Sequence, residues 1–306
     1  MARQIGGVRA QLEFGPVALL CAGLGVLPLG RAVRAAARLG EIAMALDRID
    51  RPVAMRNLEI AFPDLSVARR LTILRATYRN WGRMMAEWTH FDELTTDNVS
   101  QFVTYEGREH WDDAIRRAQG RGILTLTGHF GNFELLVVGH SAYGNPIAMV
   151  HRALRNPLMD AAVIRARTRF GAVMVTRKGG ARPVLKLLRE NFMVAIPLDL
   201  DVRKGVFVDF FSLKAATSDA LARLAMATGA PVLPAFMVRD GDSTRHRITC
   251  LPIIETVKTR DREESARENT QRYTAAIETM VRRYPDHWNW IHRRWKTRPP
   301  REPRFY

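Results

Sequence analysis

The sequence contains little cysteine and no excess of acidic residues. Only Cys21 and Cys250 occur in 306 residues, which excludes a disulfide scaffold and a zinc ribbon and suits a reducing compartment. Lysine and arginine number 47 against 31 aspartates and glutamates, giving a formal net charge of +16. Such a charge indicates an anionic partner: a nucleic acid, an anionic membrane surface, or an acidic substrate or carrier. Apolar residues make up 47% of the chain, enough for a sizeable core and too many for a disordered protein.

Most short signatures of catalytic chemistry are also missing. The sequence has no Walker A loop, no HExxH and no Cys/His zinc spacing. Residues 139–144 (GHSAYG) lack the spacing of a GxSxG nucleophile elbow. Three aspartates at 199, 201 and 209 have no histidine or further carboxylate at ligand spacing. We therefore expect neither a metal nor a cofactor.

A hydrophobic run long enough for an unambiguous membrane span is missing too. Residues 14–30 carry no charge but include Pro16 and Pro28, and a spanning helix needs about 20 apolar residues. Arg31 and Arg34 follow directly, which opposes a cleaved signal peptide and keeps the following chain cytoplasmic by the positive-inside rule. We interpret residues 1–45 as an N-terminal anchor, spanning or interfacial, and residues 46–306 as one globular domain. A buried core helix is the alternative for the apolar run.

Patterning within the globular part alternates strands with helices. Apolar residues at 71, 74, 78, 81, 85 and 88 predict an amphipathic helix capped by Ser66. Strands are predicted at 123–127, 192–198, 232–238 and 248–254, with a hairpin at Asp240-Gly241. Helices are predicted from about 134, at 156–170, at 218–228 and at 263–284. The order predicts an α/β fold with a mixed, mostly parallel sheet flanked by helices.

One segment combines a titratable base with a carboxylate. In residues 128–134 (GHFGNFE), His129 and Glu134 lie on the turn that leaves the first strand, where catalytic groups gather in open α/β sheets. A histidine can take a proton from an alcohol near neutral pH, and a carboxylate on its other ring nitrogen fixes the tautomer. On a regular helix the two positions would lie about 140° apart, so the turn must bring them together. By itself the spacing is common by chance and also fits a packed histidine beside a solvated glutamate.

Further blocks in a fixed order make the pattern specific. They are Arg56-Asn57-Leu58, Ala61-Phe62-Pro63, Asn80-Trp81-Gly82, Asn156-Pro157-Leu158, Arg177-Lys178-Gly179, Lys204-Gly205-Val206-Phe207-Val208, Thr228-Gly229-Ala230 and residues 292–300 (HRRWKTRPP). From about Arg51 to the C-terminus, the chain resembles the bacterial lipid A biosynthesis acyltransferase family, within the wider HX4D/E lysophospholipid acyltransferase group.

The resemblance implies transfer of a fatty acyl chain from acyl-acyl carrier protein, or acyl-CoA, to a hydroxyl of a membrane glycolipid. A lipid A precursor is the leading acceptor, and another lysolipid or glycolipid is the alternative. We expect direct transfer with no acylated residue. The implied partners are acyl carrier protein, the glycolipid and an anionic membrane surface. The protein is expected to act as a monomer at the cytoplasmic face of the inner membrane, without nucleic acid.

The same resemblance assigns roles to individual residues. His129 matches the general base and Glu134 its carboxylate partner. Arg167 matches a family arginine, with Arg165 and Arg169 as rival registers, and Asp199 matches an acidic residue that ends the next strand. A guanidinium also suits phosphate, and backbone N–H groups of the 128–132 turn suit an oxyanion. The resulting candidates for substrate binding are Asn132, Arg152, Arg167 and Asp199.

The C-terminal segment alternates tryptophans with bases, and its role is open. Trp288, Trp290 and Trp295, interleaved with four basic residues, fit a membrane headgroup layer or a docked tail. Basic tails with tryptophans also bind single-stranded nucleic acid, which makes a nucleic-acid-binding protein the competitor from another class. No RRM, KH, zinc-finger or helix-turn-helix signature supports that competitor. A lipid-binding scaffold without catalysis is a third possibility.

Overall fold

The structure, a computed structural model, describes residues 5–176 and 179–306. Arg177 and Lys178, part of one block quoted above, lie outside the described residues. Within these ranges a seven-stranded sheet has the order β1-β9-β8-β2-β5-β3-β4. Its strands are β1 (Val103–Glu106), β2 (Ile123–Thr127), β3 (Ile147–His151), β4 (Val173–Thr176), β5 (Met193–Pro197), β8 (Val232–Arg239) and β9 (His246–Cys250).

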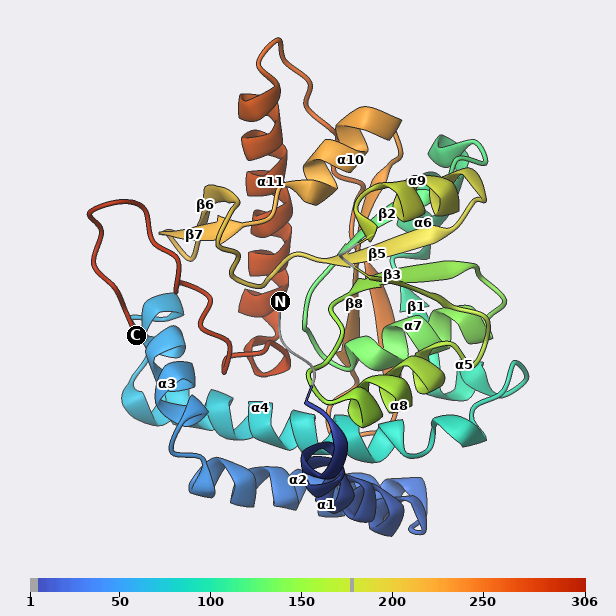
Figure 1. The fold of residues 1–306 in the computed structure, drawn as a ribbon, viewed down its shortest axis with the longest axis vertical. Coiled ribbons are helices and arrows are strands. Elements are labelled where there is room, and N and C mark those ends of the chain that lie inside the picture. Colours follow the sequence, from blue (N-terminus) through green and yellow to red (C-terminus); the bar gives the residue numbers. More distant parts are fainter. Residues whose placement is uncertain (1–4, 177–178) are drawn as a thin grey trace.

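The sheet is mixed and mostly parallel, as predicted. β8, β2, β5, β3 and β4 run parallel, β9 is antiparallel to β8, and β1 runs parallel to β9. The predicted hairpin at Asp240-Gly241 is present, although β9 begins earlier than expected. A second, two-stranded sheet of β6 (Val206–Phe210) and β7 (Leu213–Thr217) contacts α11 (Arg262–Arg283), as Figure 1 shows.

Three helix ends coincide with the signals read from the sequence. Ser66 caps α4 (Val67–Trp88), Asn156 caps α8 (Pro157–Arg167), and Gly229 with a φ of 70° ends α10 (Ala220–Thr228). The remaining helices are α1 (Gly7–Gly25), α2 (Leu29–Leu46), α3 (Asp50–Ala61), α5 (Val99–Phe102), α6 (Arg108–Ala118), α7 (Phe133–Ala142) and α9 (Arg182–Arg189). The predicted strand–turn–helix at residues 123–134 is therefore confirmed.

Helices cover both faces of the sheet because alternate strand residues point to opposite sides. On β8, Phe236 and Val238 join one core with α9, α10 and α11. Ala235 and Met237 join a second core with α6 and α7. Both faces are buried, which explains the near-continuous apolar sequence of β2 and β8.

The predicted boundary at residue 45 falls inside α2, which packs along α4. Side chains at Gly40 and Gly82 would collide with the facing backbone, since a Cβ would lie 2.1 Å from the Tyr78 carbonyl oxygen and 2.0 Å from that of Ala36. The two helices approach this closely because both positions are glycine. α2 therefore belongs to the packed helical layer under the sheet.

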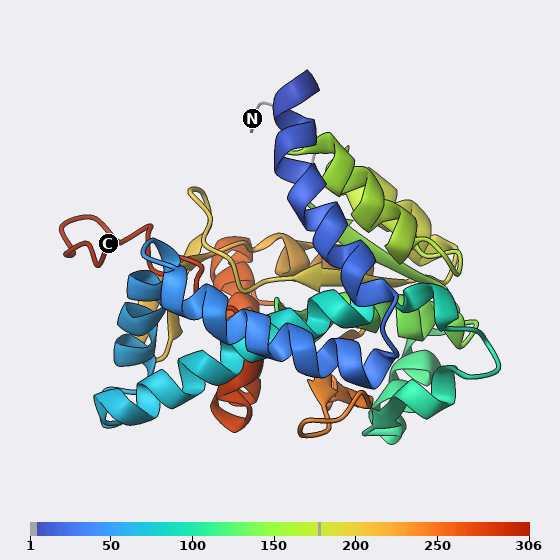
Figure 2. The ribbon, with the colours of Figure 1, turned by 90° about the horizontal axis from the view of Figure 1, so that it is seen from below.

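α1 extends along α8 and away from the rest of the molecule (Figure 2). The Asn156 side chain donates a hydrogen bond to the Ala10 carbonyl at 2.9 Å. Val8, Leu12 and Leu19 are 70%, 71% and 76% exposed. Among the described residues, no helix combines the length and the apolar character that a membrane crossing requires. Anchoring by this segment stays a prediction.

Of the two alternatives for the C-terminal tail, the structure shows the docked tail and not exposure of its tryptophans to lipid headgroups. Trp288, Trp290 and Trp295 are at most 1% exposed. Arg294 is fully buried, and its guanidinium donates to the Ala216 carbonyl at 2.9 Å and to Thr217 Oγ1 at 2.6 Å. The tail therefore forms part of the core beside β7.

Candidate active site

His129 and Asp199 meet because their strands are neighbours in the sheet. β2 and β5 pair in parallel with Thr127 opposite Pro197, and each side chain follows its strand end by two residues. Parallel strands end at the same edge of a sheet, which brings the loops together. His129 Nδ1 lies 2.9 Å from Asp199 Oδ1, and the His129 backbone N–H donates to Asp199 Oδ2 at 2.8 Å.

Two glycines allow the turn that holds this pair. A Cβ on Gly128 would lie 3.1 Å from the Asp199 carboxyl carbon, so a larger residue would push the carboxylate away. Gly131 has a φ of +56°, and a Cβ there would lie 1.9 Å from the Met237 carbonyl oxygen on β8. Steric contacts therefore explain why positions 128 and 131 of the GHFGNFE segment are glycine.

Glu134 is not the hydrogen-bonded partner of His129, contrary to the prediction. Because α7 begins at Phe133, Glu134 turns toward α8, and its carboxylate accepts from Arg167 Nε at 2.5 Å and Nη2 at 2.6 Å. The partner carboxylate is Asp199 instead. Among the three arginines considered, the register of Arg167 is the one that reaches the motif, because Arg165 is exposed and Arg169 pairs with Asp92.

Three residues predicted to bind substrate lie elsewhere or are already engaged. Asn132 is buried: its side-chain oxygen caps α7 at Leu135 N–H, and its amide donates to Glu87 Oε2 at 2.8 Å. Arg152 is exposed after β3 and makes no hydrogen bond or ion pair with the described residues. Asp199 is 2% exposed and bonded to His129. Asn132 and Asp199 are therefore engaged by other residues of the protein, and Arg152 does not line the pocket at His129.

Charge separates the pKa values of the histidine and its partner. Burial alone would raise the pKa of Asp199, but the His129 charge and hydrogen bonds from His129 and Trp288 lower it to about 2. Burial would lower the pKa of His129, yet Asp199 and, less strongly, Glu134 outweigh burial and the opposing charge of Arg167, so it lies above its usual value. Asp199 is thus ionised whenever His129 titrates.

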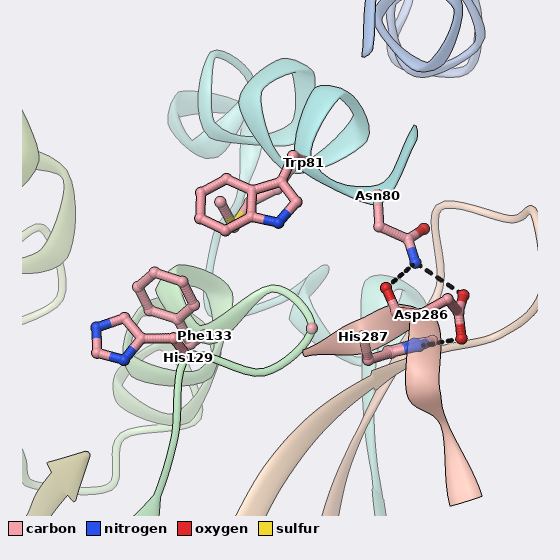
Figure 3. Close-up of a pocket in the computed structure, with 8 residues that line it drawn as sticks. Asn80, Trp81, His129, Phe133, Asp286 and His287 are labelled. Atoms are coloured by element: carbon pink, nitrogen blue, oxygen red, sulfur yellow. Dashed lines mark hydrogen bonds and ion pairs between the residues drawn. The ribbon is translucent and has the colours of Figure 1, made fainter. Parts of the chain in front are cut away.

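The ring of His129 lines a pocket between α4, the β2–α7 turn and the C-terminal tail (Figure 3). Its apolar wall contains Trp81 and Met84 of α4, and the Phe133 ring packs edge-on against the imidazole with centroids 5.1 Å apart. At the polar end, Asn80 donates to Asp286 Oδ2 at 2.9 Å. His129 Nε2 has no hydrogen-bond partner among the described residues. A neutral imidazole with its Nδ1–H held by Asp199 therefore offers Nε2 as a proton acceptor.

Some residues of the site were missed by reading the sequence. The pairing of His129 with Asp199 had a signal, because each residue comes within two positions of the end of a predicted strand. The buried Glu87–Arg239 ion pair, which holds Asn132 through Glu87, joins α4 to β8 and had none. Trp288 was noted only as part of the tail, although its indole N–H donates to Asp199 Oδ2 at 3.0 Å.

Comparisons with known proteins show the family of this chain. The sequence profile described as bacterial lipid A biosynthesis acyltransferase matches residues 14–297. The chain is 29% identical over 276 residues to the lipid A biosynthesis palmitoleoyltransferase of Escherichia coli (strain K12), covering 88% of this chain and 86% of the relative. The lauroyltransferase of the same organism is 29% identical over 285 residues, covering 92% and 90%, and the myristoyltransferase is 27% identical over 272 residues, covering 88% and 82%. This chain thus belongs to the bacterial lipid A biosynthesis acyltransferase family and is an acyltransferase.

Proposed function

We propose that this protein moves a fatty acyl chain from a thioester donor, acyl-acyl carrier protein or acyl-CoA, to a hydroxyl of a lipid A precursor. The observation that supports this is the His129–Asp199 pair, with Nε2 free in a pocket at the carboxyl edge of the sheet. The relatives carry lipid A acyltransferase names with three different acyl chains. The family therefore favours the acceptor class more strongly than any one chain length.

The proposed reaction is direct transfer. His129 Nε2 takes the proton of the acceptor hydroxyl, and the oxygen attacks the thioester carbonyl. The tetrahedral intermediate expels the thiolate, which recovers the proton from the imidazolium, leaving an ester and a thiol. Asp199 keeps Nδ1 protonated and stabilises the imidazolium. A positioned general base of this kind contributes about 10²–10⁴-fold.

Arg167 is the group we assign to the developing oxyanion. In the turn, the N–H groups of His129 and Gly131 are already bonded, to Asp199 and to the His287 carbonyl. Arg167 uses Nε and Nη2 on Glu134, and its Nη1 makes no hydrogen bond within the described residues. Its partner Glu134 lies at the start of α7, five residues after His129, which holds the guanidinium beside the 128–132 turn. A pre-positioned donor of this kind stabilises charge that develops in the transition state.

The membrane surface is the proposed location, with the catalytic domain at the cytoplasmic face of the inner membrane. Exposed apolar side chains on α1 continue onto α2 at Leu39, Ile42 and Leu46, and arginines at 31, 34 and 38 follow the apolar run. An interfacial helix with flanking bases binds anionic lipid by burial and charge together. Replacing Leu12 and Leu19 by Glu should reduce sedimentation with anionic vesicles at high salt by at least fivefold. The surface variant Arg69→Gln, on α4, serves as the control. Unchanged binding would contradict a role for α1.

The decisive test of the function is His129→Ala. Purified wild-type protein should convert a lipid A precursor into a product with one more ester-linked chain when it is given acyl-acyl carrier protein with a radiolabelled acyl chain. The variant should lose about 10³-fold in rate while its melting temperature stays near the wild type. Mass spectrometry of lipids from a deletion strain identifies the acceptor as the species that lacks one acyl chain. A folded His129→Ala protein with full activity would overturn the mechanism.

A further inference from the structure

The C-terminal tail crosses the 128–132 turn and contacts Asp199, the carboxylate partner of His129. Phe130 forms an isolated antiparallel bridge with Trp288, and the Gly131 N–H donates to the His287 carbonyl at 2.7 Å. From the same strip of chain, the Trp288 indole N–H reaches Asp199 Oδ2 at 3.0 Å. A segment about 90 residues later in sequence than Asp199 therefore contacts it directly.

The three tail tryptophans make different hydrogen bonds. Trp288 donates to a carboxylate, Trp290 donates to the Pro285 carbonyl at 2.6 Å, and Trp295 Nε1 has no partner among the described residues. All three are equally buried. The Trp288 ring is fixed by edge contacts with Phe210 and Trp290, at centroid distances of 5.3 and 4.6 Å. The chain thus supplies matched controls for the indole donor.

We propose that Trp288 is a positioning residue that holds Asp199 in the orientation in which it can serve His129. The inference rests on the proposed function. Two donors, the His129 backbone N–H and the Trp288 indole, occupy Oδ2, which leaves Oδ1 for the His129 ring. Without the indole, Oδ2 keeps one donor, and the carboxylate gains rotational freedom in a buried site. Accurate placement of a base depends on such supporting contacts.

The indole also shares the negative charge of Asp199. The charged and titratable groups facing this carboxylate are His129, His292 and Arg294, and Glu134 and Arg167 act on His129 from α7 and α8. When one donor is removed, the carboxylate charge is less compensated and attracts the imidazolium more strongly. His129 then holds its proton to a higher pH.

The test compares Trp288→Phe with Trp290→Phe and Trp295→Phe. For Trp288→Phe we expect kcat to fall about tenfold with KM for the acyl donor within twofold, and the acid limb of the rate profile to move to higher pH. Trp290→Phe loses a hydrogen bond of the same tail, and Trp295→Phe loses none; both should keep the wild-type acid limb. An acid limb of Trp288→Phe that is unchanged or lower, or kcat within twofold of wild type, overturns the proposal.

A double-mutant cycle links the effect to Asp199. In an Asp199→Asn background, Trp288→Phe should change kcat by less than twofold, because its target is already altered. An undiminished tenfold loss there would show that the tail acts by another route. If Trp288→Phe does not fold, ¹⁵N-tryptophan-labelled wild type decides. The chemical shift of one indole N–H resonance should follow the titration of His129, and this dependence should disappear in His129→Ala. If no indole resonance behaves in this way, the proposal is overturned.

Failure of this inference is distinguishable from failure of the function. Loss of activity in His129→Ala with wild-type behaviour of Trp288→Phe would keep the general base and remove the tail from its support. Full activity in His129→Ala would remove both.

Discussion

Two charged pairs lie at the carboxyl edge of the sheet, and they are built differently. Asp199 is fully buried while the His129 side chain is 24% exposed, so one member faces the pocket. Arg167 and Glu134 are 10% and 12% exposed, and a bidentate contact joins them. The first pair presents a group that changes protonation near neutral pH. The second joins a guanidinium to a carboxylate through two parallel hydrogen bonds.

The difference shows that His129 and Glu134 belong to separate pairs. Glu134 orients an arginine, and the acid that serves the histidine comes from the next strand of the sheet. The five-residue spacing is therefore a property of the turn and of the α7 start, since Asn132 caps the helix and Phe133 begins it. Substitutions that separate the pairs test this division.

Asp199→Asn should have the largest effect, about 10³-fold on kcat, as expected when a buried carboxylate that fixes a histidine tautomer is lost. Two N–H groups point at Oδ2, so the new amide would place its oxygen there and its NH₂ toward His129 Nδ1. The ring would then carry its proton on Nε2 and could not act as a base. Steady-state rates with acyl-acyl carrier protein as the donor measure the loss, and circular dichroism checks the fold. Activity within tenfold of wild type would mean that Asp199 does not set the tautomer.

Arg167→Gln should lower kcat about 10²-fold, in the range expected for a lost oxyanion donor. The control is Arg165→Gln at an exposed neighbouring position, whose kcat should stay within twofold of the wild type.

The partner variant Glu134→Gln leaves the buried Arg167 without a negatively charged partner, so we expect the free energy of unfolding to fall by about 3 kcal/mol. Combining both substitutions should recover stability without recovering activity. Thermal melts and rates on the same samples separate the two quantities. Recovery of activity in the double variant would show that Arg167 serves the fold alone.

The class of the fold and several of its elements were predictable, because their signals are local. The capping of α4 by Ser66 and of α8 by Asn156, and the buried run of β2, each depend on neighbouring residues. Strand order depends on contacts between distant segments, such as β8 beside β2, which periodicity does not encode. The sequence therefore predicted a mixed, mostly parallel sheet but not the order of its strands.

The site was predictable by residue and less so by partnership. His129 was predicted from its place after a strand, whereas Glu134 was assigned to it because the two are close in sequence.

At the two chain ends, too, the sequence pattern did not identify the packing partners. Both α1 and the tail looked suited to a membrane surface, yet Trp290 is buried and Leu19 is exposed. An aromatic-basic pattern fits a headgroup layer and a buried tail equally well until the packing partners, here Phe210 and Phe62, are known.

The smallest expected effect is a displacement of the pH profile. Because Asp199 outweighs burial and raises the pKa of His129 above its usual value, and because the base works when neutral, kcat/KM should fall on the acid side of a midpoint that is higher than for an ordinary histidine. Asp199, with a pKa of about 2, does not titrate in that range. The stability of the pair follows the opposite course. A histidine whose folded pKa is raised stabilises the fold fully below its unfolded pKa and loses that contribution as pH rises through the folded value. Activity should therefore rise over the interval in which the melting temperature declines slightly. In NMR titrations of the His129 ring, which do not depend on activity, Glu134→Gln should shift the midpoint less than Asp199→Asn, since the charge of Glu134 acts more weakly on the ring. A midpoint below the usual value of a histidine would mean that burial outweighs the charge of Asp199. A larger shift from Glu134→Gln would place the stronger partner of His129 on α7.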